Sequence, residues 1–202
     1  MTAKISGKRN GGYTKELAEL VFTFTPELDN MTDAGLLLHL DDLVQAEVDR
    51  IFGVGNHSVF LTTTEQAFHI AWNIQVQGIV DGYNMASSII SKLSDYLYPG
   101  VVATTLTDPY LRMVYGQDVV FVYKDEILSW WINSFAEYLP QHSRMSNSFI
   151  KIMTRFTLLH EYRHCCQSKR LMRFSNSYLS ELDADEYARQ VIISQIFLEQ
   201  DW

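Results

Sequence analysis

The dominant hydrophobic pattern along the chain is a helical repeat, in which apolar residues return every three or four positions. It is first seen between residues 32 and 52, where Gly53 follows as a terminator. The apolar positions of this stretch are Leu36, Leu40, Leu43, Val44, Val48 and Ile51. Residues 64–97 predict a second helical stretch with a break near residues 78–82, which hold two glycines. Residues 125–139 predict a further helix, rich in aromatic side chains.

Between these helices the pattern changes to short apolar runs that are typical of strands. Residues 58–63 and 101–106 each predict one strand. Residues 111–115 and 118–123 predict a hairpin around Gly116-Gln117. The whole pattern predicts an α+β fold, mostly helical, with a small mixed or antiparallel sheet.

The last 62 residues contain neither glycine nor proline, and they predict two long helices. Ser146 or Asn147 can cap the first of them, and Ser180 with Asp183 can cap the second. The first helix has an apolar stripe at the spacing of a buried face. The stripe consists of Phe149, Ile152, Met153, Phe156 and Leu159. We expect this stripe to anchor the helix in the core.

The polar side of that helix carries the motif HExxH, formed by His160, Glu161 and His164. Residues four apart lie on one face of a helix, so both imidazoles can bind one metal ion. The glutamate beside the first histidine can reach a water bound to that ion. This combination is typical of zinc hydrolases in which the glutamate is the general base.

A catalytic zinc ion usually has three protein ligands, so a third ligand is needed. The segment ExxAD follows the motif, with Glu181 and Asp185 one helical turn apart. They share a face with Ala184 and Ala188, whose small side chains favour close approach of two helices. Glu181 can then ligate the metal while Asp185 orients an imidazole ligand. Asp185 as the ligand in place of Glu181 is the alternative.

With these two segments the chain resembles the gluzincin metallopeptidases, including their compact single-domain members. The run ELDADEYA is also similar to the ImmA/IrrE group, and the resemblance covers about residues 148–198. It implies a zincin-like active-site helix, followed by a helix bearing the glutamate ligand. It implies Zn²⁺ bound by His160, His164 and Glu181. It further implies Glu161 as general base and Asp185 as the residue that orients a ligand imidazole.

The charge of the chain argues against general binding of nucleic acid, because the formal net charge is −8. Six of the sixteen basic residues nevertheless fall within residues 151–173. Cations near the C-terminal end of the motif helix are the favoured explanation. The alternative is an acidic substrate or an arginine that stabilises an oxyanion.

The two cysteines, Cys165 and Cys166, are adjacent and cannot form a disulfide framework. Reduced thiols and the lack of an 18-residue apolar run predict a cytoplasmic protein without a membrane span. The cysteines stand where many gluzincins have glycine, which is a departure from the family pattern. Residues 1–14 are expected to be a flexible tail and residues 15–202 a single domain.

Peptide-bond hydrolysis also needs a group that holds the developing oxyanion. Tyr178 and His142 are the first candidates; the others are Tyr187, Arg163 and Arg173. The remaining histidines, His39, His57 and His69, are interpreted as structural. In gluzincins a sheet edge pairs with an extended substrate. The strand at residues 118–123 is the candidate for that edge here.

Two other functional classes fit parts of the pattern. The first is a regulatory or binding module that keeps a zincin scaffold without catalysis. Retention of Glu161, which a structural zinc site does not need, disfavours it. The second is a DNA-linked peptidase of the SprT-like kind. The absence of a histidine after His164 disfavours that class. The favoured partner is therefore a protein or peptide substrate.

Overall fold

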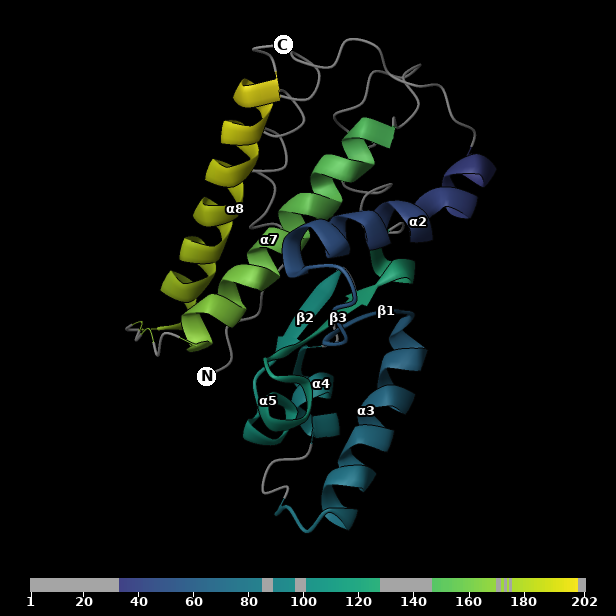
Figure 1. Ribbon diagram of the computed structural model, residues 1–202, viewed down its shortest axis with the longest axis vertical. Coiled ribbons are helices and arrows are strands. Elements are labelled where there is room, and N and C mark those ends of the chain that lie inside the picture. Colours follow the sequence, from purple (N-terminus) through teal and green to yellow (C-terminus); the bar gives the residue numbers. More distant parts are fainter. Residues whose placement is uncertain are drawn as a thin grey trace.

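The computed structural model describes residues 33–84, 89–96, 101–127, 147–169 and 176–199, together with residues 172 and 174. The helices are α2 (Asp33–Phe52), α3 (Thr64–Val80), α4 (Ile89–Tyr96), α5 (Pro109–Tyr115), α7 (Asn147–Lys169) and α8 (Ser177–Glu199). The strands are β1 (Val59–Thr62), β2 (Ala103–Leu106) and β3 (Val119–Tyr123). The fold is mostly helical α+β with a small mixed sheet, which confirms the predicted class (Figure 1).

The sheet has the order β1-β3-β2. The central strand β3 runs parallel to β1 and antiparallel to β2. Every residue of β3 is buried, because strands flank it on both sides and helices cover both faces. The prediction that residues 118–123 form the free edge of the sheet is therefore wrong. A buried all-apolar run indicates a central strand, whereas β2 contains two threonines and lies at an edge.

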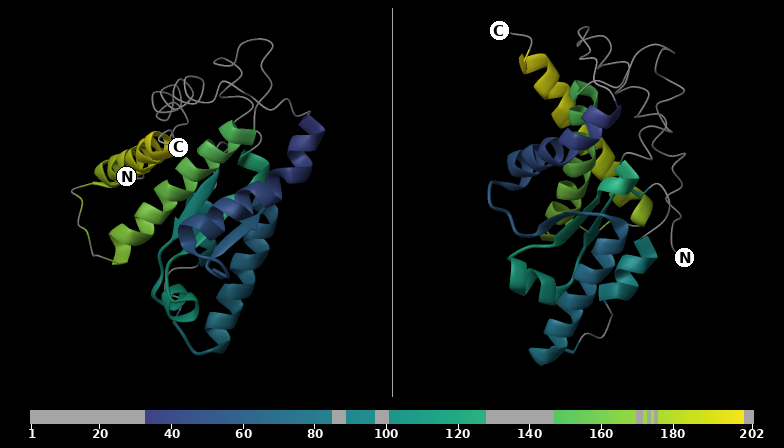
Figure 2. Two further views of the ribbon diagram at one scale, coloured as in Figure 1. Left: turned by 45° about the horizontal axis from the view of Figure 1, so that its top comes forward. Right: turned by 90° about the vertical axis from the view of Figure 1, so that its right-hand side faces the viewer.

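Helices cover the two faces of the sheet differently. Helices α3 and α4 pack on one face around an apolar cluster. The buried members of the cluster are Ala67, Ala71, Ile89, Leu93, Leu106, Tyr110, Leu111, Val119, Phe121 and Tyr123. Helices α7 and α2 lie on the other face, α7 against β2 and α2 against β1. Helix α8 packs along α7 on the side away from the sheet (Figure 2).

The long helices begin and end near their predicted positions. Helix α2 ends at Phe52 and is followed by Gly53, whose φ of 95° is accessible to glycine at low cost. The helical stretch of residues 64–97 is broken as expected, with α3 ending at Val80 and α4 starting at Ile89. Thr63 starts α3 as part of a capping box with Gln66. Among the described residues, no helix has the length and apolar character to cross a membrane.

The predicted hairpin of residues 111–115 and 118–123 is wrong, because its first arm is helix α5. The Asp108 side chain accepts a hydrogen bond from the amide of Tyr110, and Pro109 occupies the first helical turn. Gly116 ends the helix in the left-handed conformation, with φ of 74°. An Asp-Pro start and a glycine stop are helix signals, and here they override the strand-like composition between them.

The predicted cap of the final helix is also wrong. Helix α8 begins at Ser177, and the side chain of Asn176 accepts a hydrogen bond from the amide of Leu179. Ser180 and Asp183 therefore lie inside the helix, and both bind Gln167 of α7. Several predictions lie outside the described residues. These concern residues 1–32, the cap at Ser146 and residues 128–139.

Candidate metal centre

The candidate site lies between α7 and α8, which pack against each other and lie side by side in Figure 1. Two residues of the predicted apolar stripe of α7, Phe156 and Leu159, are buried at 6% and 5% exposure, whereas the side chains of Phe149, Ile152 and Met153 lie outside the described residues. Ala184 and Ala188 of α8 are fully buried, as expected for the contact between two closely packed helices. The rigid packing of α7 thus presents the next helical turn, which holds the HExxH motif, towards α8.

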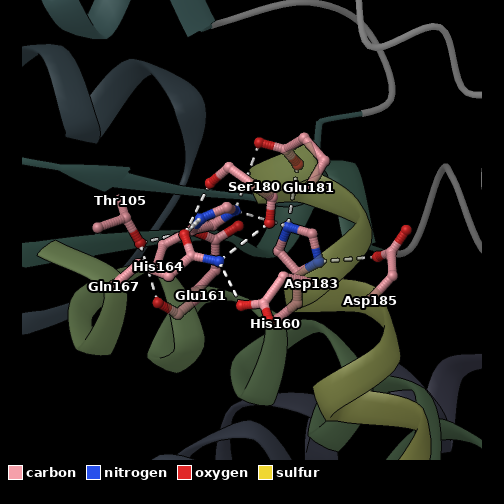
Figure 3. A network of polar contacts seen from close by, with 9 residues as sticks. All are labelled: Thr105, His160, Glu161, His164, Gln167, Ser180, Glu181, Asp183 and Asp185. Atoms are coloured by element: carbon pink, nitrogen blue, oxygen red, sulfur yellow. Dashed lines mark hydrogen bonds and ion pairs between the residues drawn. The ribbon is translucent and has the colours of Figure 1, made fainter. Parts of the chain in front are cut away.

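Three side chains meet between the helices: His160 and His164 from α7, and Glu181 from α8. The Nε2 atoms of the two histidines lie 3.0 Å apart. Glu181 Oε2 lies 3.3 Å from His160 Nε2, and Glu181 Oε1 lies 3.4 Å from His164 Nε2 (Figure 3). Two ligand atoms bound tetrahedrally to one zinc ion would be separated by about 3.3 Å, given bonds of about 2.0 Å. The spacing of this group therefore fits a metal ion.

Hydrogen bonds at the opposite ring nitrogens set the orientation of both imidazoles. His160 Nδ1 lies 2.8 Å from Asp185 Oδ1, and His164 Nδ1 lies 2.9 Å from Gln167 Oε1. Both partners are acceptors, so each Nδ1 carries the proton, and each Nε2 of a neutral ring presents a lone pair. Two lone pairs and a carboxylate then face one another. This arrangement favours a cation among them, either a metal ion or a proton.

The pKa values of the three side chains also indicate a site that favours positive charge. Burial would lower the pKa of His160, but its hydrogen bonds to Asp185 and Glu181 outweigh burial and raise the pKa to about 10. Burial also opposes a charge on His164, yet Glu181 raises the pKa of that ring as well. Burial would raise the pKa of Glu181, but the two histidines hold it well below its usual range. The group is therefore a strong site for positive charge, either protons or a metal ion.

Glu161, the predicted general base, points towards the sheet. Its carboxylate accepts a hydrogen bond of 2.6 Å from the hydroxyl of Thr105 on β2 (Figure 3). The side chain is largely withdrawn from solvent, with the residue 7% exposed. Glu161 thus lies between the edge strand β2 and the His–His–Glu group.

The geometry distinguishes the two acidic residues that compete for the ligand position. Glu181 faces Nε2 of both histidines, whereas Asp185 faces Nδ1 of His160. Asp185 therefore occupies the place expected of a residue that orients the ring. Glu186 is bound to Arg189 on the same helix and does not belong to the group. The ligand role of each residue stays a prediction.

Three residues around the site were not anticipated as part of it: Gln167, Thr105 and Asp183. Gln167 binds His164, Ser180 and Asp183, and it is only 5% exposed. Its spacing of three from His164 places both on one helix face, and this signal could have identified it. Thr105 lies 56 positions before Glu161 and belongs to another element, so no local pattern indicates that contact.

The residues considered for oxyanion stabilisation differ in their contacts and exposure, and two of them lie outside the described residues. Arg163 is bound to Asp183 by two hydrogen bonds of 2.7 and 3.1 Å and lies over the ring of Tyr187. Tyr178 is exposed, at 45%. His142 and Arg173 are outside the described residues, as is the side chain of His39. No oxyanion-stabilising role is tested by these positions, and it stays a prediction.

Two arginines of the basic cluster pair with acidic residues, and the two cysteines lie outside the candidate metal centre. Arg155 is buried and forms two hydrogen bonds with Glu47 of α2, and Arg163 pairs with Asp183 of α8. These two arginines are thus held by acidic residues of neighbouring helices. Both cysteines are free thiols, as predicted, and neither belongs to the His–His–Glu group. The described histidines His57 and His69 also lie outside the group.

Comparison with known proteins yields no relative: no protein-family model matches the chain, and no curated protein or solved structure matches it significantly. The similarity to gluzincins consists of the motif and of the His160–His164–Glu181 group across two helices. That arrangement is consistent with an HExxH…E zincin-like site.

Proposed function

We propose that the chain is a zinc-dependent metallopeptidase that hydrolyses peptide bonds. In this proposal His160, His164 and Glu181 hold the zinc ion, and Glu161 is the general base. The observation that carries the proposal is the convergence of two imidazole nitrogens and a carboxylate within 4.8 Å of one another. Hydrolysis requires a general base in addition to the zinc ion, and Glu161 is adjacent in sequence to the proposed ligand His160.

The chemistry requires little beyond the residues already described. Zinc bound by two imidazoles and a carboxylate supplies Lewis-acid chemistry and an open ligand position for water. Glu161 accepts a proton from the attacking water and then donates it to the leaving amine. The hydroxyl of Thr105 fixes one carboxylate oxygen of Glu161, so the base has a defined orientation before substrate binds. Asp185 orients His160 through Nδ1.

The substrate in this proposal is an extended peptide bound along β2. Strand β2 is an edge strand, and its outer side is unpaired among the strands described. An extended peptide can pair with such an edge through main-chain hydrogen bonds. Thr105 of β2 contacts Glu161, so a peptide on that edge would lie close to the proposed base.

The decisive experiment compares the wild type with Glu161→Gln. Purified protein is assayed for bound zinc and is incubated with a proteome-derived peptide library, with cleavage followed by mass spectrometry. We expect one zinc ion per chain in both proteins and a loss of cleavage of at least about 100-fold in Glu161→Gln, because the base is removed. Glu186→Gln is the matched control, since Glu186 lies on α8 and outside the group.

The same preparations test the ligand assignment. Alanine at Asp185 should weaken zinc binding about 10- to 100-fold, the range for a residue that orients a ligand. Alanine at Glu181 should weaken it further, because a ligand is lost. Zinc binding that depends on Asp185 but not on Glu181 would refute the assignment.

A regulatory module with a structural zinc ion is the second candidate. The observation in its favour is that Glu161 is buried and bound to Thr105, as a purely structural carboxylate would be. In that case the wild type and Glu161→Gln would bind zinc equally and neither would cleave any peptide. Absence of zinc binding in the wild type would reject both candidates.

A further inference from the structure

We propose that Gln167 is a positioning residue that keeps the proton of His164 on Nδ1 and so directs Nε2 towards the metal ion. Asp183 binds Gln167 and is itself bound by Arg163, so these two residues hold Gln167 in place. The inference rests on the metal site of the proposed function and adds residues that the HExxH…E pattern does not contain.

The first step is the orientation of the Gln167 amide, which its neighbours determine. The amide nitrogen donates to the carbonyl oxygen of Ser180 at 3.0 Å and to Asp183 Oδ2 at 2.8 Å. Both of these atoms are acceptors only, so the group facing them must be the NH₂ end of the amide. Oε1 therefore points the other way, towards His164 and the hydroxyl of Ser180 (Figure 3).

The second step follows from what an amide oxygen can do. Gln167 Oε1 only accepts hydrogen bonds, and it lies 2.9 Å from His164 Nδ1. The tautomer of His164 with its proton on Nδ1 is thus favoured, and Nε2 is left to bind the metal ion. The second lone pair of Oε1 accepts from Ser180 Oγ at 2.7 Å. All donors and acceptors of this buried amide are consequently used, and a flipped amide would lose them together.

The third step is the anchor at the far end. Arg163 donates to both carboxylate oxygens of Asp183, at 2.7 and 3.1 Å. Because Asp183 is held by this fork, it is a fixed acceptor for the Gln167 amide. Arg163 and Gln167 belong to α7 and Asp183 to α8, so the chain of contacts also ties together the two helices that carry the ligands.

The two histidines are therefore oriented by unlike groups. A carboxylate, Asp185, holds His160, whereas a neutral amide holds His164. Asp185 belongs to α8, whereas Gln167 follows His164 by three positions on the same helix. Gln167 thus does for the second histidine what Asp185 does for the first, without adding a negative charge.

The test uses two substitutions of similar size. Gln167→Met removes every hydrogen bond of the amide, whereas Gln167→Glu keeps an acceptor facing His164 but loses both donated bonds. Zinc affinity is measured by competition with a chelator. The absorption spectrum of the Co²⁺-substituted protein, which depends on the ligand geometry, is recorded beside it. Gln190→Met is the matched control, because Gln190 is an exposed glutamine of α8 that bonds to Glu186.

We expect Gln167→Met to lose about 10- to 100-fold in zinc affinity and to change the Co²⁺ spectrum. Gln167→Glu should lose less affinity and keep the wild-type spectrum, since His164 retains its acceptor. A purely structural amide predicts the reverse, because Gln167→Glu loses both helix-to-helix bonds donated by the amide and places a carboxylate beside Asp183. If affinity follows thermal stability across the two variants, or if both bind zinc like the wild type, the inference is wrong.

Should Gln167→Met fail to fold, Asp183→Asn with Gln167→Glu still decides the question. Asp183→Asn weakens only the anchor of Gln167. We therefore expect it to lower the zinc affinity by less than about 10-fold, which is less than the loss expected when an orienting residue itself is removed. An unchanged affinity in both of these variants would overturn the inference. Failure of the wild type to bind zinc would instead reject the proposed function, so the two failures are distinguishable.

Discussion

The two faces of the sheet are built by different rules. The face covered by α3 and α4 is packed by a cluster of buried apolar residues around Phe121. The face covered by α7 holds buried polar groups, and the described side chains of α7 alone contribute five. They are Thr154, Arg155, Thr157, Glu161 and Gln167. The difference is large for two layers that share one three-stranded sheet.

Buried polar groups destabilise a fold unless they are hydrogen-bonded, so their concentration on one face calls for an explanation. Arg155 bonds to Glu47 of α2 and Gln195 of α8, and this contact joins three helices. Glu161 bonds to Thr105, and Gln167 to Ser180 and Asp183. The apolar face thus supplies stability, and the polar face fixes the directions of side chains around the candidate metal centre.

The largest expected difference between the two faces is in how the free energy of unfolding of the metal-free protein depends on pH. The pKa of His160 is raised from 6.5 to about 10. A raised pKa means that the folded state favours the protonated ring, so this stabilisation is complete below pH 6.5 and is lost as the pH rises to about 10. At 1.36 kcal/mol per pKa unit, the free energy of unfolding should fall by about 4 to 5 kcal/mol over this range. Urea unfolding with a chelator present measures it.

His160→Gln is the control for that prediction, because it lacks the titrating ring and should show a much flatter profile. The buried tyrosines of the other face, Tyr110 and Tyr123, have raised pKa values and do not titrate in this range. Zinc should reverse the trend, since the ligands must lose protons to bind it and affinity therefore rises with pH. An equally steep loss of stability in His160→Gln would place the sensitive group elsewhere.

A somewhat smaller effect is expected from a cavity on the apolar face. Phe121 is fully buried and stacks on Phe60, with ring centroids 5.3 Å apart. Phe121→Ala should lower the free energy of unfolding by about 3 to 4 kcal/mol, because a large apolar side chain is removed from a packed core. Zinc affinity of the folded protein should change by no more than about twofold, since distant sites act independently. Denaturant unfolding and chelator competition measure the two quantities.

Val76→Ala is the control for the cavity, because Val76 lies on the outer side of α3 and is 42% exposed. It should change stability by less than about 0.5 kcal/mol. If Phe121→Ala weakened zinc binding by the same free energy that it removes from stability, the two faces would not be separate units.

The sequence was sufficient for the elements whose signals are local. The apolar repeats and the terminating Gly53 predicted the long helices, and the spacing of four placed His160 beside His164. The same spacing rule brought Glu181 and Asp185 to one face of α8, as the structure has them. These predictions succeed because the geometry of a helix fixes which positions share a face.

Predictions failed where contacts between distant segments, or competing local signals, determine the structure. The order of the strands depends on pairing between residues far apart, so the all-apolar run of residues 119–123 indicates a buried central strand but not which strands flank it. Helix α5 has only seven residues, too few for a periodicity to be read, and its Asp108 and Gly116 ends carried the signal. The contact of Thr105 with Glu161 depends on how β2 packs against α7, which is a property of the whole fold.

The smallest expected effect comes from two neighbouring threonines of β2 that point to opposite faces. Thr105 donates to the Glu161 carboxylate, whereas the buried hydroxyl of Thr104 has no well-formed hydrogen bond to any described residue. Thr105→Val should cost about 1.5 kcal/mol, the low end for a bond to a charged group, because Thr105 is partly exposed. Thr104→Val should change the free energy of unfolding by less than about 0.5 kcal/mol, because the Thr104 hydroxyl has only a weak contact with the hydroxyl of Tyr123. Both substitutions keep the shape and the strand propensity of the side chain. A difference in unfolding free energy therefore reports the hydrogen bond alone, and equal effects would show that Thr105 does not hold Glu161.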